Sequence, residues 1–184
     1  MDFRQLIKEC RKGSTAAQKF LFDNMAGPML SICRRYIKNP EDSEEIMLDG
    51  FFRFFKTLPS FQYHNEAALF AWVKRIMINE CLMFLRRRNA FTMSLESEIE
   101  ETPLPEQTFD KLEAKDIMAL IVQLLVGYRT VFNLYAVEGM GHKEIAQLLG
   151  ITEGTSKSQL SKARQLLQKL LVQQNEEYAN RKAR

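Results

Sequence analysis

Apolar residues recur at helical spacing along positions 3–36, with glycine and proline interrupting the pattern. Gly13 closes a first short helix, and Ser14 or Thr15 can cap the next. That second pattern reaches Gly27-Pro28 and then resumes. The residues expected to face inward are Phe3, Leu6, Ile7 and Cys10, then Phe20, Leu21 and Met25, and after the interruption Met29, Ile32, Cys33 and Tyr36.

Two further helices are predicted before position 90. The third covers about residues 41–58, follows Asn39-Pro40 and is stopped by Pro59. The fourth covers about residues 67–88, after the polar interval SFQYHNEA, and ends in three arginines that the helix dipole favours at a C-terminus. Their inward faces are expected to be Met47, Phe51, Phe54, Phe55 and Leu58, and Phe70, Val73, Met77, Cys81 and Phe84.

Residues 89–108 are acidic, contain Pro103 and Pro105 and show no sustained period, which indicates a linker. Helical spacing returns near Phe109 and continues over 128–138, 142–149 and 153–174, with apolar positions Leu112, Ile117, Leu120, Ile121, Leu124 and Leu125 at its start. The pattern predicts an all-α protein of two small helical domains. Their bounds are 1–90 and 109–175, with an acidic linker at 91–108 and a charged tail at 176–184.

Residues 142–172 have the pattern of a helix-turn-helix. Gly150 can adopt the left-handed conformation of a sharp turn, Thr152 can cap the following helix, and Ala146 is small enough for a close helix crossing. The second helix is expected to bury Leu160, Ala163, Leu167 and Leu170. Ser156 falls within this apolar stripe, where its hydroxyl is expected to bond back to a backbone carbonyl.

The opposite side of this helix is polar and cationic, with Lys157, Ser158, Ser161, Lys162 and Gln165. In a DNA major groove such lysines can reach phosphates or guanine edges, and hydroxyl and amide groups can bond to bases. The alternative is an ordinary solvated face opposite an apolar stripe. The small-residue turn favours the DNA-reading interpretation.

Charge and composition narrow the function. The net charge is only +3, but residues 94–116 hold eight acidic and two basic residues, whereas 155–184 hold seven basic and two acidic. This asymmetry indicates a basic working surface and an acidic segment kept away from it. No apolar run is long enough to span a membrane and the N-terminus lacks a signal pattern, so a cytosolic protein is expected.

Nothing in the chain indicates an enzyme or a cofactor. The three cysteines are expected to be buried thiols, neither disulfide-bonded nor bound to zinc. His64 and His142 are the only histidines, and no nucleophile, metal-ligand spacing or phosphate-binding loop accompanies them. His142 is interpreted as a helix cap or a surface residue.

Four stretches together resemble a known family. They are NPEDSEEIMLDGFF, LFAWVKRIMINECLMFLRRR, YRTVFNLYAVEGMGHKEIAQLLGI and GTSKSQLSKAR. From about residue 5 to 172 the chain resembles a bacterial RNA polymerase sigma factor of the extracytoplasmic-function (ECF) group of the sigma-70 family. The resemblance implies a promoter-specificity factor that binds core polymerase, recognises the −35 and −10 promoter elements and promotes DNA melting.

The resemblance also implies partners and sites. Core polymerase would be bound through the clamp helices of its largest subunit and through its flap, with no small-molecule substrate. The implied clamp-binding residues are Asp42, Glu45, Leu48, Asp49, Phe52 and Arg53. Leu48 and Phe52 can equally belong to a second buried surface against the first helix. Family members are often held inactive by an anti-sigma protein, so the resemblance also suggests an anti-sigma partner for this chain.

The −10 element would be read by the interval after the third helix and by the fourth helix. Phe61 and Tyr63 can stack on bases, and Gln62, His64 and Asn65 can read base edges. Contacts to phosphate or single strand are expected from Lys74, Arg75, Asn79, Arg86, Arg87 and Arg88, whereas Trp72 is interpreted as core. The −35 duplex would be held by Thr155, Lys157, Ser158, Ser161 and Lys162.

The chain departs from the family pattern at several positions. Leu48 stands for Gln, Met83 for Asp, Leu125 for Pro, Ser156 for Val and Gln159 for Arg. The replacement of Arg by Gln159 is expected to remove a cation from the second helix of the helix-turn-helix. The −35 sequence that family members recognise therefore does not carry over to this chain. Two other functions fit parts of the pattern: a helix-turn-helix regulator that never docks on polymerase, and a helical adaptor that binds no DNA.

Overall fold

The computed structural model describes residues 2–88 and 114–182, and within α8 it describes side chains as far as Gln173. The predicted linker and the stretch from Phe109 to Leu112 lie outside the described residues. Over the described ranges the chain is helical and contains no strand. It divides into two compact units, Met1–Arg87 and Arg88–Arg184.

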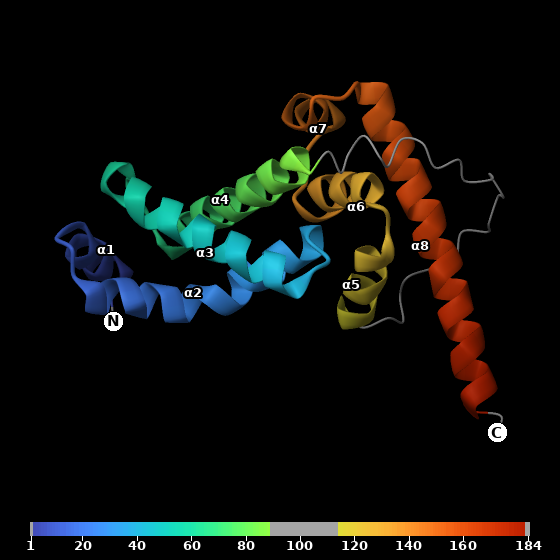
Figure 1. The fold of residues 1–184 in the computed structure, drawn as a ribbon, viewed down its shortest axis with the longest axis horizontal. Helices are drawn as coiled ribbons and strands as arrows, with labels where there is room; N and C mark the ends of the chain where they lie inside the picture. The colour runs from blue at the N-terminus through green and yellow to red at the C-terminus, as the bar shows by residue number, and fades with distance from the viewer. Residues whose placement is uncertain (1, 89–113, 183–184) are drawn as a thin grey trace. The chain divides into compact units, whose positions relative to one another are not determined.

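Four helices build the first unit, in blue to green in Figure 1: α1 (Phe3–Arg11), α2 (Thr15–Tyr36), α3 (Pro40–Thr57) and α4 (Glu66–Arg87). The helices α2, α3 and α4 pack on one another, and α1 packs on α2. A single 3-10 turn, η1 (Leu58–Ser60), holds Pro59 and follows α3. All four helices were predicted from the apolar spacing, with bounds that agree to within a residue or two.

Side-chain oxygens fix where these helices begin. Ser14 accepts a hydrogen bond from the backbone N–H of Ala17 (3.3 Å), which confirms it as the cap of α2. Asn39 accepts from Asp42 N–H (2.7 Å) at the start of α3. The helix α2 continues unbroken through Pro28, where the pattern had shown an interruption. Each cap satisfies an N–H that has no partner inside its helix.

The predicted core of the first unit is correct at most positions. Leu6, Leu21, Met25, Phe54 and Val73 are among the buried residues. The prediction that Phe20 faces inward is wrong, since 39% of its surface is exposed. Four other predicted core residues are only half-buried: Phe3, Phe55, Phe70 and Phe84. Aromatic rings continue from α2 through this core: Phe22 lies 4.7 Å from Phe51, and Phe54 lies 5.5 Å from Trp72.

The three cysteines are buried free thiols, as expected. Although distant in the sequence, Cys33 on α2 and Cys81 on α4 meet in the core. A hydrogen bond to Cys33, together with burial, raises the pKa of Cys81 well above its usual value. Burial and the neighbouring Glu9 raise the pKa of Cys10. The raised pKa values keep the thiols of Cys10 and Cys81 protonated at neutral pH.

In the second unit α8 (Glu153–Lys182) packs against α5 (Ala114–Gln123), α6 (Val126–Phe132) and α7 (His142–Leu149). A stretch of π-helix, η2 (Asn133–Val137), extends α6. The core contains Leu120, Ile121, Leu124 and Tyr128. The prediction that Leu125 belongs to the apolar face of a helix is wrong, because it lies between α5 and α6 with 42% of its surface exposed. The last helix was predicted to end near position 174, but α8 continues to Lys182.

A buried arginine closes α5. Arg129 donates from Nη1 to the carbonyl of Val122 (2.9 Å), in the last turn of α5, and to that of Leu124 (3.2 Å), just after the helix. Burial lowers the pKa of its guanidinium, although the group remains charged near neutral pH. Arg129 thereby fixes the junction between α5 and α6 beneath α8.

Candidate nucleic-acid interface

The predicted helix-turn-helix is present at α7 and α8. Gly150 has φ +71°, and its N–H and that of Ile151 both donate to the carbonyl of Ala146, at 2.9 and 3.1 Å. Thr152 accepts a hydrogen bond from the N–H of Thr155 (3.0 Å) at the start of α8. The left-handed glycine, the cap and the buried small residue were all predicted from the sequence.

The inward face of α8 is predicted correctly as far as Leu167. Leu160, Ala163 and Leu167 are buried, but the stripe continues through Leu171, and Leu170 is only half-buried. At 100° per residue Leu171 lies about 20° from Leu160 around the helix, whereas Leu170 lies about 80° away. The stripe therefore follows the helical period more closely than the prediction did.

The polar face of α8 is open to solvent. Lys157, Ser158 and Ser161 are exposed, and Thr155 and Lys162 are half-buried. These side chains are therefore not packed into the protein's own interior. Thr155 Oγ1 lies 2.9 Å from Thr152 Oγ1, so the capping residue also orients this hydroxyl. The face offers hydroxyl groups and two ammonium groups within three turns of one helix.

Two polar residues of α8 differ from expectation, Gln159 in its position and Ser156 in its hydrogen-bond partner. Gln159 is only 6% exposed and belongs to the packed side, so its substitution for arginine takes no cation from the open face. Ser156 is fully buried, and its hydroxyl bonds to Nδ1 of His142 at 2.9 Å rather than to a backbone carbonyl. His142 is neither the cap of α7 nor a free surface residue: it is half-buried and its ring stacks on Tyr135.

The interval between η1 and α4 is more constrained than its composition predicted. Phe61 stacks face to face on Trp72, with ring centroids 4.2 Å apart, so one face of Phe61 is already covered. Trp72 is half-buried rather than fully in the core. Asn65 accepts from the N–H of Ala68 (2.8 Å) and caps α4. Gln62 and His64 are exposed.

Two arginines that the sequence reasoning missed hold this interval against α1. Arg11 donates to the carbonyls of Leu58 (3.4 Å) and Phe61. The guanidinium of Arg4 lies 5.7 Å from the ring centroid of Tyr63. Partial desolvation, with Glu66 and Asp2 nearby, raises the pKa of Tyr63, so its hydroxyl remains a donor. Neither arginine stands out in the sequence, because the contacts join α1 to a segment far along the chain.

The cationic and amide side chains expected to contact DNA on and just after α4 are accessible. Arg75, Asn79, Arg86, Arg87 and Arg88 are exposed, and Lys74 is half-buried. They extend along α4 and one residue past its end, and the aromatic interval directly precedes this helix.

An exposed apolar pair lies on α3. Leu48 is 54% exposed and Phe52 is 72% exposed, one helical turn apart, which makes the alternative of a second buried surface wrong. Glu45, Asp49 and Arg53 are exposed around the pair, and Asp42 is half-buried. Arg53 also forms an ion pair with Glu80 of α4.

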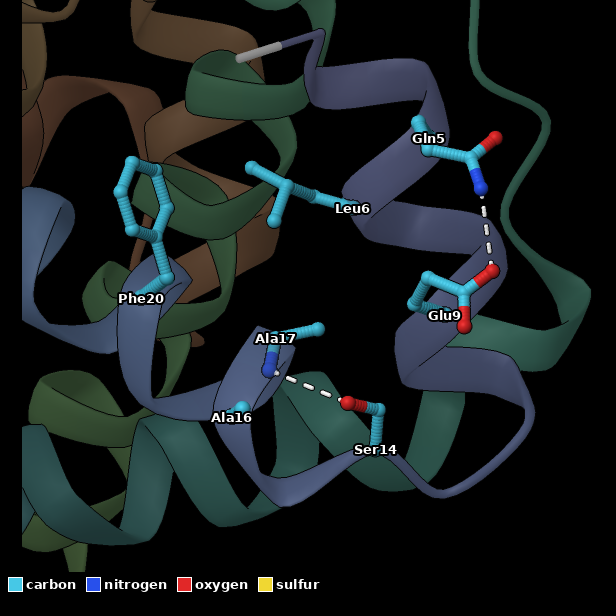
Figure 2. A pocket seen from close by; sticks show the side chains of 7 residues that line it. All are labelled: Gln5, Leu6, Glu9, Ser14, Ala16, Ala17 and Phe20. Carbon is cyan, nitrogen blue, oxygen red and sulfur yellow. Dashed lines mark hydrogen bonds between the residues drawn. The ribbon is translucent and has the colours of Figure 1, made fainter.

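An apolar pocket of about 360 Å³ lies between α1 and α2. Figure 2 shows Leu6, Ala17 and Phe20 along it, beside the hydrogen bonds from Gln5 to Glu9 and from Ala17 to Ser14. It shares no residue with the predicted sites. In the described part of the chain no cluster of acidic, histidine or cysteine side chains is placed to hold a metal, and no helix there could cross a membrane.

Comparison with known proteins gives consistent matches. Residues 21–91 match the family described as Sigma-70 region 2, and residues 114–167 match Sigma-70, region 4. The chain is 30% identical over 141 residues to ECF RNA polymerase sigma factor SigM of Mycobacterium tuberculosis, which covers 76% of this chain and 69% of the relative. It is 26% identical over 185 residues to SigW of Bacillus subtilis, with 93% and 97% covered. A solved structure of sigma factor RpoE with anti-sigma factor NepR from Bartonella quintana aligns with a TM-score of 0.49 at 23% identity, over 83% of this chain and 95% of that one.

Proposed function

Since this chain belongs to the ECF group of the sigma-70 family of RNA polymerase sigma factors, we propose that its two helical units divide the work of promoter recognition between them. The chain is a promoter-specificity factor that binds core RNA polymerase and promoter DNA. The proposal concerns which residues make each contact. It places the −10 element and the polymerase clamp on residues 1–90, and the −35 element and the polymerase flap on 109–175.

The second unit is proposed to hold the −35 duplex with the open face of α8. Its contact residues are Thr155, Lys157, Ser158, Ser161 and Lys162. The support is that these side chains are exposed or half-buried on the first turns of α8, which a left-handed glycine and a threonine cap position against α7. A helix presented in this way can enter the major groove, where ammonium groups contact phosphate or guanine and hydroxyls contact base edges.

The first unit is proposed to capture and melt the −10 element. Tyr63, Gln62 and His64 can meet an unpaired base, and Phe61 offers only the ring face that Trp72 leaves open. Base stacking on an aromatic ring contributes roughly 1–3 kcal/mol, enough to offset much of the local unpairing. Asn65 is left with its amide N–H groups, because its oxygen caps α4. The cations on and just after α4, together with the amide of Asn79, would follow the strand backbone: Lys74, Arg75, Arg86, Arg87 and Arg88.

Polymerase docking is proposed for the exposed surface of α3. Leu48 and Phe52 supply apolar anchors, and Asp42, Glu45, Asp49 and Arg53 supply a polar rim. The exposure of Phe52 is the single observation that carries this assignment, because a lone folded chain gains nothing from a phenylalanine with 72% of its surface in water. The acidic stretch 91–108 would then be the tether between the two units.

Reconstitution tests the assignment. The full chain, added to core polymerase, should support run-off transcription from a promoter selected from random DNA, and Leu48→Ala with Phe52→Ala should abolish polymerase association. Duplex binding that does not need polymerase, with unaltered behaviour of this variant, would support the regulator instead. Loss of both activities in the parent chain would support the adaptor.

A further inference from the structure

The buried hydroxyl of Ser156 joins the two helices of the helix-turn-helix. Ser156 is the fourth residue of α8, His142 is the first residue of α7, and Nδ1 of His142 lies 2.9 Å from Ser156 Oγ. Ser156 is fully buried, so its hydroxyl cannot exchange this bond for one to water. Breaking the bond would leave a buried polar group unsatisfied, which costs more than a surface hydrogen bond is worth.

The ring of His142 is also held by a contact with η2. Its ring lies 4.7 Å from that of Tyr135, with the planes inclined by 24°. Tyr135 belongs to the π-helical stretch η2, and the guanidinium of Arg164 lies 5.7 Å from the centre of its ring. Arg164 returns to α8, two turns beyond Ser156. The contacts therefore run from α8 through α7 and η2 and back to α8.

This circuit controls where the first turn of α8 lies. Ser156 and Arg164 are about 12 Å apart along the helix axis, so two fixed points resist both tilting and rotation. Thr155 and Lys157 are the immediate neighbours of Ser156 and belong to the open face. A rotation of the helix start that breaks the Ser156 bond would displace these two side chains directly.

We propose that His142 is a positioning residue that sets the sequence discrimination of α8 through its hydrogen bond to Ser156. The inference rests on the proposed −35 contact of this helix. Base-edge hydrogen bonds require close alignment, whereas phosphate contacts tolerate small shifts. Loosening the bond should thus reduce discrimination between −35 sequences more than it reduces overall DNA affinity.

Matched variants separate the bond from the stack. His142→Phe keeps an aromatic ring against Tyr135 but removes the hydrogen bond, and Ser156→Ala removes the hydroxyl. His142→Asn places an amide at the position of Nδ1 and keeps a hydrogen-bonding group, and Ser156→Thr keeps the hydroxyl. Gln147→Ala, on the exposed side of α7, is the control.

The measurement is run-off transcription by holoenzyme containing each full-length variant. Templates are a promoter selected from random DNA by the parent holoenzyme and derivatives with single base-pair changes at −35 or at −10. His142→Phe and Ser156→Ala should each reduce −35 discrimination by about three- to tenfold, the range expected for one net hydrogen bond. Discrimination at −10 should not change, and the double variant should be no worse than either single one.

The outcomes are distinct. Unchanged −35 discrimination in folded His142→Phe and Ser156→Ala would overturn the inference, and so would additive effects in the double variant. If either variant fails to melt cooperatively, His142→Asn and Ser156→Thr decide. Discrimination equal to that of the parent holoenzyme supports the proposal, and a loss of about three- to tenfold in both variants overturns it. A parent holoenzyme without any −35 preference would instead refute the proposed function of α8.

Discussion

Phe61 and Trp72 lie face to face, with ring centroids 4.2 Å apart and planes inclined by 7°. The stack fixes a residue of an irregular segment to the first half of α4, and Arg11 holds the same segment through its backbone carbonyls. The segment that we assign to the −10 element is therefore formed before DNA arrives. A preformed site avoids the ordering cost that a flexible loop would incur on binding.

Phe61→Ala should reduce open-complex formation on duplex promoters by about tenfold, because it removes both the Trp72 stack and a surface for an unpaired base. A template already unpaired at −10 should largely restore activity, since melting is then no longer required. Permanganate reactivity of the −10 thymines measures the effect. Equal defects on both templates would contradict the assignment.

Asn65 allows capping and base reading to be separated. Asn65→Ser retains a side-chain oxygen for Ala68 N–H but loses the amide, whereas Asn65→Ala loses both. We expect Asn65→Ala to lower the free energy of unfolding by about 1 kcal/mol and Asn65→Ser to change it little. If the amide reads a base, both variants should lose −10 discrimination equally. If Asn65→Ser keeps −10 discrimination and only Asn65→Ala loses it, Asn65 acts as a helix cap and does not read a base.

Phe52→Ala should weaken core polymerase binding by about 2 kcal/mol, or about 30-fold, if Phe52 is a central anchor. The melting temperature should remain unchanged, because the side chain is mostly in water. Phe20→Ala, an exposed aromatic on α2, is the matched control. Competition with a labelled reference sigma factor for core polymerase gives the affinity. Equal effects at both phenylalanines would indicate general hydrophobicity rather than a docking site.

Lys157→Glu combined with Lys162→Glu should abolish promoter-specific initiation while leaving core polymerase binding nearly intact. The two ammonium groups belong to the open face of α8, and reversing their charge repels the duplex phosphates. In milder form, replacement of either lysine by Gln should lower the salt slope of duplex binding by about 1. Lys169→Glu, an exposed position farther along α8, should leave initiation unchanged.

Arg129→Met should destabilise the second unit by about 1–3 kcal/mol, because the carbonyls of Val122 and Leu124 lose their buried donor. Urea unfolding followed by far-UV circular dichroism measures the loss. Trp72 is the only tryptophan in the chain and belongs to the first unit, so its fluorescence midpoint provides an internal reference. A shift in that midpoint would show that the effect is not confined to the second unit.

Local periodicity predicted the helices and the turn at Gly150, because each depends on residues within a few positions. For Leu48 and Phe52 it left an exposed and a buried position equally open. It failed where distant segments meet. Ser156 stood out as a polar residue in an apolar stripe, but its partner lies across the turn on another helix. Arg4 and Arg11 gave no signal, since a cation on a short helix is ordinarily solvated. Leu125 faces outward because the helix expected to bury it breaks between α5 and α6.

The buried thiols report on transient opening of the first unit. Every cysteine of the chain lies in the first unit, and burial makes each one slow to react. A raised pKa also keeps Cys10 and Cys81 in the unreactive protonated form. An alkylating reagent should therefore modify them only during moments when that bundle opens. The labelling rate would measure how often the first unit opens. A slower rate in the presence of core polymerase would show that docking stabilises the packed helices.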